Sequence, residues 1–144
     1  MIITRQDNFL DKDKCNQAVN FFITKSINTI KYRDTITLQC KDPYVLNKVN
    51  SCFNIHDFSE RSVSNMQIVQ WPVGSKMEPH KDIGDRFSFL IYLNDNFKGG
   101  ETIIDGIKIK PKQGRLVLFS NGHYEHEVKE VTDGIRYTLI AWYK

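Results

Sequence analysis

Short β-forming runs, separated by turn signals, fill the second half of this sequence. Runs rich in β-branched and aromatic residues at such close intervals favour an all-β sandwich or barrel. The dipeptide Asp105-Gly106 lies between two of the runs and is a strong signal for a two-residue hairpin turn. The runs are Met66–Trp71, Arg86–Asn94, Glu101–Ile104, Ile107–Lys110, Arg115–Ser120, Tyr124–Val128 and Arg136–Tyr143.

The first half of the sequence carries helical patterns instead. In the stretch Asp11–Thr29 apolar residues recur at helical spacing, and its first residue can cap the helix. Asp42-Pro43 indicates a second helix, because aspartate caps well and proline suits the first helical position. Residues Thr35–Gln39 alternate like a strand. We therefore expect a mainly β protein in which residues 1–65 form a helical support region for a β core at residues 66–144.

Length and charge restrict what the chain can be. Its 144 residues are sized for a single domain, and we expect a monomer. The 20 Lys and Arg residues exceed the 17 Asp and Glu residues by only three and are scattered, so no nucleic-acid partner is expected. No stretch approaches the ~20 apolar residues of a membrane span, and Asp7 interrupts the N-terminus before a signal peptide could form. We expect neither a membrane partner nor export.

The three cysteines agree with a reducing compartment. Cys15, Cys40 and Cys52 cannot all pair, and no two of them have the CxxC spacing of zinc or redox sites. Buried, reduced thiols and a cytoplasmic location are therefore the expectation.

The tripeptide His80-Lys81-Asp82 is the sharpest chemical feature. In an extended segment residues i and i+2 point to the same side, so the imidazole and the carboxylate converge. His126 follows later in the β-forming second half, and two imidazoles with one carboxylate are the ligand set of a non-haem iron site. His123 lies close enough to compete with His126 as a ligand. A tripeptide of this kind is also common in surface loops.

The β-forming run Arg136–Tyr143 also indicates a functional site. Alternation along a strand places Arg136, Thr138, Ile140 and Trp142 on one face. An arginine on such an apolar face is costly if it is buried without an anion, and its planar fork suits a carboxylate. The other interpretation is an arginine at a strand end that reaches solvent.

Further landmarks follow one another between Met66 and Trp142. They are Gln67–Gly74, Glu78-Pro79 leading into His80-x-Asp82, Leu90–Asn94, Gly99–Thr102, Lys112–Arg115 leading into Val117–Phe119, His126-x-Val128, Thr132-x-Gly134 and Arg136-Tyr137-x-Leu139-x-x-Trp142. In this order and spacing the chain resembles the prolyl 4-hydroxylase-like branch of the Fe(II)/2-oxoglutarate-dependent oxygenases. The resemblance implies a double-stranded β-helix, a jelly-roll or cupin-like fold of about eight strands with supporting N-terminal α-helices.

The resemblance also implies roles for individual residues. His80, Asp82 and His126 would hold Fe(II), and Arg136 would bind the distal carboxylate of 2-oxoglutarate with help from Tyr92.

Three further residues are expected around the same site. Thr138 and Trp71 would contribute to the cosubstrate pocket, and Trp142 would line the substrate site. Trp71 stands where relatives often have a tyrosine, and an indole can donate a hydrogen bond but cannot accept one as a phenol does.

The activity implied by the resemblance is that of a 2-oxoglutarate-dependent dioxygenase. It would couple O2 and decarboxylation of 2-oxoglutarate to hydroxylation of prolyl residues in a peptide or protein, with ascorbate as an additional cofactor. The walls of the substrate site are expected in Asp57–Asn65 and Ile83–Arg86.

Three alternatives stay open at this point. One is a hydroxylase of free proline or another small molecule, and another is a metal-binding β-helix module without turnover. Arg136 and Tyr92 favour an enzyme, because a structural metal site would need no cosubstrate anchor. The third is a nucleic-acid oxidative demethylase, which the near-neutral charge and the single arginine after His126 disfavour.

Overall fold

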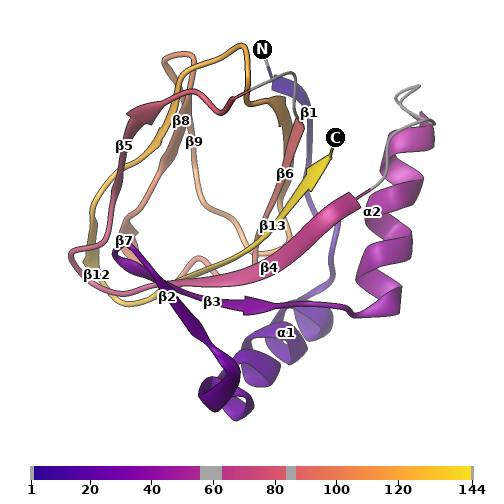
Figure 1. Cartoon of the computed structure of the whole chain (residues 1–144), viewed down its shortest axis with the longest axis vertical. Helices are drawn as coiled ribbons and strands as arrows, with labels where there is room; N and C mark the ends of the chain where they lie inside the picture. Colours follow the sequence, from indigo (N-terminus) through magenta and orange to yellow (C-terminus); the bar gives the residue numbers. More distant parts are fainter. Residues whose placement is uncertain (1, 56–62, 84–86, 144) are drawn as a thin grey trace.

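The computed structural model describes residues 2–55, 63–83 and 87–143, and Figure 1 shows how their elements are arranged. The helical elements are α1 (Lys12–Thr24), a short 3-10 helix (Ser26–Asn28) and α2 (Pro43–Ile55). The strands are β1 (Ile2–Gln6), β2 (Ile30–Tyr32), β3 (Thr35–Gln39), β4 (Val63–Trp71), β5 (Met77–His80), β6 (Phe87–Tyr92), β7 (Lys98–Gly99), β8 (Thr102–Ile104), β9 (Ile107–Ile109), β10 (Leu116–Ser120), β11 (His126–Val128), β12 (Val131–Asp133) and β13 (Arg136–Tyr143).

Two antiparallel sheets make up most of the structure. The larger sheet has the order β1-β10-β6-β13-β4-β3-β2, and the smaller sheet has the order β5-β11-β8-β9. From β4 onward the chain alternates between them, because β4, β6, β10 and β13 lie in the larger sheet and β5, β8, β9 and β11 in the smaller one. This alternation confirms the expected double-stranded β-helix, whose two sheets lie at the left of Figure 1.

Side chains of the larger sheet alternate between two cores. On β13, Tyr137, Leu139 and Ala141 join the outer core, which also contains buried residues of both helices. Arg136 and Thr138 point to the inner side, where the two sheets face each other. The predicted alternation of this strand is therefore confirmed, and it places the arginine inside the β-helix.

Both helices cover the outer face of the larger sheet, and both begin where the sequence predicts. The carboxylate of Asp11 accepts a hydrogen bond from the Lys14 backbone N–H at 2.8 Å, and that of Asp42 accepts one from the Tyr44 N–H at 2.9 Å. The prediction that the first helix continues to Thr29 is wrong. α1 ends at Thr24, and Ile27 is 91% exposed. Helices this short depend on packing of an apolar face, and Ile27 finds no core to pack against.

The first 65 residues contribute strands as well as helices. The strand predicted at Thr35–Gln39 is confirmed as β3, whereas β1 and β2 were not predicted. β1 pairs with β10, whereas β2 and β3 form a hairpin that extends the larger sheet beyond β4. β2 is only three residues long, too short for an alternating pattern to identify a strand, and all three residues are exposed.

Several short strands were missed, and one segment predicted as loop is partly strand. β5, β7 and β12 have four residues or fewer. β4 begins at Val63, so the end of the segment Asp57–Asn65 is strand, while residues 57–62 and 84–86 lie outside the described residues. Ile83 is 90% exposed.

The Asp105-Gly106 hairpin is confirmed. Both residues have positive φ, 49° and 77°, as the mirror-image turns that join such strands require, and they connect β8 to β9. Within the described residues, neither helix combines the length and the apolar character needed to cross a lipid bilayer.

Candidate active site

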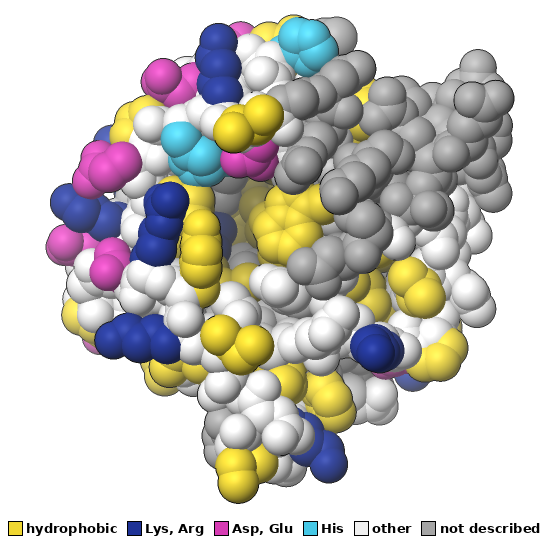
Figure 2. Space-filling model, viewed as in Figure 1, with side chains coloured by type: hydrophobic (Ala, Val, Ile, Leu, Met, Phe, Trp, Pro, Cys, Tyr) yellow, Lys and Arg dark blue, Asp and Glu magenta, His cyan; other side chains and the backbone are white. Residues whose placement is uncertain are grey.

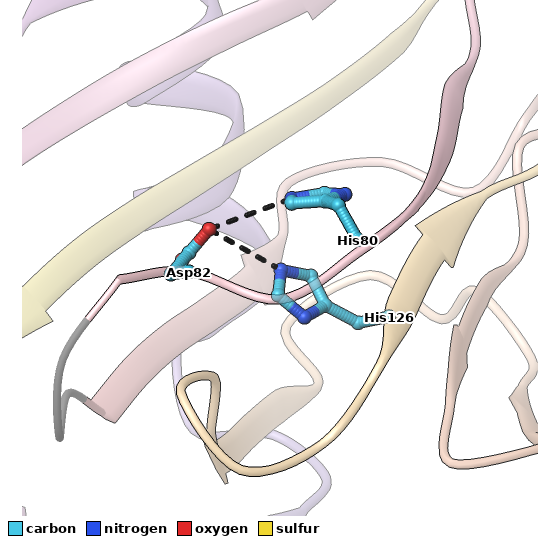
Figure 3. Close-up of side chains that lie close together, drawn as sticks. All are labelled: His80, Asp82 and His126. Carbon is cyan, nitrogen blue, oxygen red and sulfur yellow. Dashed lines mark ion pairs between the residues drawn. The ribbon is translucent and has the colours of Figure 1, made fainter.

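The strand register brings His80, Asp82 and His126 together, and we call these three residues the metal cluster. His80 ends β5, His126 begins β11, and the two residues are direct partners across the smaller sheet, with ring centroids 4.2 Å apart. Asp82 follows β5, and its Oδ1 lies 3.5 Å from His80 Nε2 and 3.9 Å from His126 Nε2 (Figure 3). The three side chains converge on one point, as the tripeptide and the distal histidine predict.

Backbone carbonyls orient both imidazoles of the metal cluster. Nδ1 of His80 lies 2.8 Å from the Glu78 carbonyl oxygen, and Nδ1 of His126 lies 3.2 Å from that of Tyr124. A carbonyl only accepts, so each Nδ1 donates to it, and in the neutral ring that binds a metal the lone pair is then on Nε2. The free lone pairs face the Asp82 carboxylate, which is the arrangement a metal ligand needs.

Burial lowers the pKa of His126 below its usual value. The neighbouring His80 also lowers it, whereas the hydrogen bond to the Tyr124 carbonyl and the charge of Asp82 raise it. A lowered pKa keeps the His126 ring neutral at near-neutral pH, and metal binding requires a neutral ring.

The cluster fits a divalent iron ion. The candidate ligand atoms of its three residues all lie within 4.8 Å of one another. Two imidazoles and a carboxylate on one side of a metal are the donor set of non-haem Fe(II) sites, which leave further coordination positions open. His123 is not part of this group, because its Nδ1 pairs with Ser120 Oγ at 2.9 Å and its side chain is exposed.

Arg136 lies at the start of β13 and is 1% exposed. Its Nη2 donates a hydrogen bond to Thr102 Oγ1 at 3.0 Å, and the same oxygen accepts one from the Tyr92 hydroxyl at 2.8 Å. The guanidinium carbon lies 4.7 Å from the ring centroid of Trp71 and 5.4 Å from that of Tyr92. Burial lowers the Arg136 pKa, but a guanidinium stays charged at any physiological pH.

This arrangement suits a bound carboxylate. Arg136 Nε is buried and has no hydrogen-bond partner among the described residues. Thr102 Oγ1 already accepts two hydrogen bonds, so its own proton remains to be donated. A carboxylate could accept from both groups, and a bidentate contact with a guanidinium is among the strongest protein hydrogen bonds. These residues therefore fit one end of 2-oxoglutarate.

Gly100 makes room for the arginine. A Cβ atom at Gly100 would lie 2.9 Å from Arg136 Cδ, and the residue has a φ of +67° that side chains other than glycine rarely adopt. The turn before β8 thus restricts the position of the Arg136 side chain.

One cavity of about 180 Å³ joins the metal cluster to Arg136. Figure 2 shows a hollow on this face of the molecule, with hydrophobic side chains around it and histidine and acidic side chains at its edge. The lining includes all the candidate residues except His80 and Tyr92, and consists of Tyr32, Val69, Trp71, Met77, Asp82, Ser88, Leu90, Thr102, Phe119, His126, Val128, Arg136, Thr138, Ile140 and Trp142.

The remaining candidates fall at this cavity with clear contacts. Trp71 stacks on Arg136, and its Nε1 donates a hydrogen bond to Thr138 Oγ1 at 3.4 Å. The only N–H of the indole ring is therefore already paired with this hydroxyl. Trp142 lines the cavity at the far end of β13. Thr102 and Gly100 were given no role from the sequence, although both lie within the Gly99–Thr102 landmark.

A double-stranded β-helix with a cluster of two histidines and one aspartate beside a buried arginine defines a class of non-haem iron oxygenase. The chain belongs to the 2OG-Fe(II) oxygenase superfamily, whose family model matches residues 66–144. Membership implies Fe(II), 2-oxoglutarate and O2, for which the cluster and the arginine have the appropriate chemistry.

Sequence relatives include prolyl hydroxylases. Human prolyl 3-hydroxylase 2 is 42% identical over 65 residues, which cover 40% of this chain and 9% of that protein. Probable prolyl 4-hydroxylase 11 of Arabidopsis thaliana is 38% identical over 64 residues, which cover 38% of this chain and 24% of that protein. The similarity thus spans only a small part of these relatives.

Solved structures share the fold over nearly the whole chain. A prolyl-4-hydroxylase of Pseudomonas putida has a TM-score of 0.82 at 18% identity, covering 98% of this chain and 91% of that one. The viral collagen prolyl hydroxylase of Paramecium Bursaria Chlorella virus-1, in complex with 2-oxoglutarate, has a TM-score of 0.80 at 19% identity, covering 97% and 93%. Both comparisons support the double-stranded β-helix.

Proposed function

We propose that the protein is an Fe(II)- and 2-oxoglutarate-dependent hydroxylase of prolyl residues in a peptide or protein. The observation that carries this proposal is a single cavity that joins the metal cluster to the Arg136 site. A purely structural metal would need no anion site beside it. The relatives named as prolyl hydroxylases support the choice of substrate.

Each group of residues has a separate task in this proposal. The metal cluster holds Fe(II), which supplies the oxidative chemistry together with O2 and 2-oxoglutarate. Arg136 and Thr102 bind the distal carboxylate of the cosubstrate and so set its distance from the cluster. Trp71 and Tyr92 pack around the guanidinium and exclude water from it, which strengthens its attraction for a carboxylate.

A groove beside the cavity supports a peptide substrate. This outer groove has a volume of about 370 Å³ and shares Tyr32, Trp71, Met77 and Trp142 with the cavity, among other residues. It forms where β2 and β3 extend the larger sheet past the smaller one. Its full lining is Ile30, Tyr32, Thr35, Thr37, Gln67, Val69, Trp71, Met77, Ile140 and Trp142.

The chemistry of the outer groove favours a peptide over a free amino acid. Among the described residues that line it, none carries a charged side chain, so these residues offer no partner for a free ammonium or carboxylate group. An extended segment with a proline has its φ already fixed, which reduces the entropy lost on binding. Trp142 and Trp71 can pack against the proline ring.

The test is hydroxylation of a panel of proline-containing peptides with Fe(II), 2-oxoglutarate, O2 and ascorbate. We expect succinate release and a mass gain of one oxygen on the proline, and no gain on matched peptides in which alanine replaces that proline. Omitting ascorbate in a parallel series tests its role as a reductant.

Two other outcomes would contradict the proposal in different ways. Modification of free proline or another small molecule, with every peptide unmodified, would assign a small-molecule hydroxylase. Absence of 2-oxoglutarate consumption with all candidate substrates, in protein that binds iron, would favour a metal-binding module without turnover.

A further inference from the structure

Asn121 forms hydrogen bonds with two residues beside the metal cluster. It follows β10, in the turn that leads to His126, and it is fully buried. Its backbone carbonyl accepts a hydrogen bond from the Asp82 N–H at 3.0 Å. Its side-chain Nδ2 donates to the hydroxyl of Ser88 on β6.

These two hydrogen bonds join Asn121 to Asp82 and to Ser88. Asp82 lies after β5 and before β6, outside every strand, so no sheet ladder fixes its backbone. The bond to the Asn121 carbonyl does so instead. Ser88 lies six residues further along, within β6, and its side chain is buried beside the cavity. Asn121 therefore connects the backbone of Asp82 to Ser88 on β6.

The same end of β10 also contacts the other side of the metal cluster. The ring of Phe119 packs edge-on against the His126 ring, with centroids 5.2 Å apart. Phe119 and Asn121 thus link this end of β10 to a histidine on β11 and to the backbone N–H of Asp82 after β5. A shift of Asn121 would change the distance between Asp82 and His126.

Stability alone does not explain the buried side chain of Asn121. Its Oδ1 is buried and has no hydrogen-bond partner among the described residues. An unpaired buried carbonyl lowers stability, and this cost offsets part of the stability that the hydrogen bond to Ser88 contributes. The arrangement is better explained by a geometric task.

We propose that Asn121 is a positioning residue that fixes Asp82 in the metal cluster through its bond to Ser88. The inference rests on the proposed function in so far as the cluster binds a metal. Residues that orient metal ligands typically change metal affinity by about 10-fold to 100-fold when they are altered.

The experiment titrates the metal-free protein with Co2+ in the absence of cosubstrate, followed by visible absorption, and measures the Tm of the same metal-free samples. The variants are Asn121→Ala, Ser88→Ala and the double variant. Ser120→Ala is the matched control, because Ser120 directly precedes Asn121 at the end of β10 and the variant loses one side-chain hydrogen bond, to His123.

We expect Asn121→Ala and Ser88→Ala each to weaken Co2+ binding about tenfold or more, and the double variant to bind no more weakly than the weaker single variant. Ser120→Ala should lower the Tm but leave Co2+ affinity unchanged. If Asn121→Ala does not fold, Ser88→Ala decides the question alone.

Co2+ affinity unchanged in both single variants, with a lower Tm as in Ser120→Ala, would overturn the inference and leave Asn121 a structural residue. Failure of the wild-type protein to bind Co2+ would instead overturn the metal site itself. The two failures are therefore distinguishable.

Discussion

The guanidinium of Arg136 stacks on the indole of Trp71, with its central carbon 4.7 Å from the ring centroid. The two residues are also direct partners in the register of β13 and β4. The Trp71 ring therefore packs against the guanidinium, and the indole offers no acceptor that would compete with a bound carboxylate.

Replacing Arg136 should act mainly on the cosubstrate. Truncating a buried partner of a carboxylate typically costs about 2–5 kcal/mol, so Arg136→Ala should raise the KM for 2-oxoglutarate well over tenfold. Arg136→Lys should be milder, because a lysine keeps the charge. Steady-state kinetics with varied 2-oxoglutarate measures both. An unchanged KM in Arg136→Ala would place the anchor elsewhere.

Adding one methyl group at Gly100 should also weaken binding of 2-oxoglutarate, because it displaces the Arg136 side chain. Gly100→Ala brings a Cβ to 2.9 Å from Arg136 Cδ, whereas Gly106→Ala meets nothing within 4 Å and shares the strain of a positive φ, +77°. We expect both variants to lose stability by about 1 kcal/mol or more, but only Gly100→Ala to raise the KM for 2-oxoglutarate. Equal KM values for 2-oxoglutarate in the two variants would show that contact between residue 100 and Arg136 does not affect cosubstrate binding.

The two nearby histidines should behave differently. His126→Ala should abolish succinate release and weaken binding of Fe(II), because it removes a ligand of the cluster. His123→Ala removes an exposed ring that pairs with Ser120, so turnover should change by less than about twofold. Turnover that survives in His126→Ala and disappears in His123→Ala would reassign the ligand.

The attachment of β1 should depend on pH. Asp7 accepts a hydrogen bond from Arg115 Nε at 2.7 Å and lies 3.3 Å from Lys112 Nζ, and the Arg115 hydrogen bond is the main cause that lowers the Asp7 pKa to about 2. A carboxyl with a lowered pKa stabilises the fold above its unfolded-state value of 3.8 and loses that contribution as the pH falls toward 2.

Asp7→Asn should therefore lower the Tm at pH 7, and the difference from wild type should shrink between pH 4 and pH 2. Thermal unfolding of both proteins at a series of pH values gives the comparison. A difference that is the same at pH 7 and at pH 2 would mean that the ion pair is not its origin.

The sequence alone was sufficient for those parts of the site that depend on local pattern. His80 and Asp82 are separated by one residue, and Arg136 follows strict alternation along β13, so both can be placed before the fold is known. The double-stranded β-helix could be named because its landmarks recur in order. Helix starts were equally predictable, since Asp11 and Asp42 cap through contacts two or three residues away.

Other parts depend on contacts between distant residues. Thr102 matters because Tyr92 and Arg136 both reach its hydroxyl, 10 and 34 residues away in sequence. Gly100 resembles any turn glycine until Arg136 is packed against it. β2 has three exposed residues and pairs with β3, and a run of three alternating residues is too short to predict a strand.

The buried charge of Arg136 has a consequence for how long the protein survives in a cell. Among the described residues no carboxylate forms an ion pair with this guanidinium, so the native state carries a positive charge that a bound anion would neutralise. A ligand that binds only the native state stabilises it by mass action, by about 2.7 kcal/mol at 100 times its Kd. The supply of 2-oxoglutarate would then govern resistance to proteolysis as well as the rate of turnover.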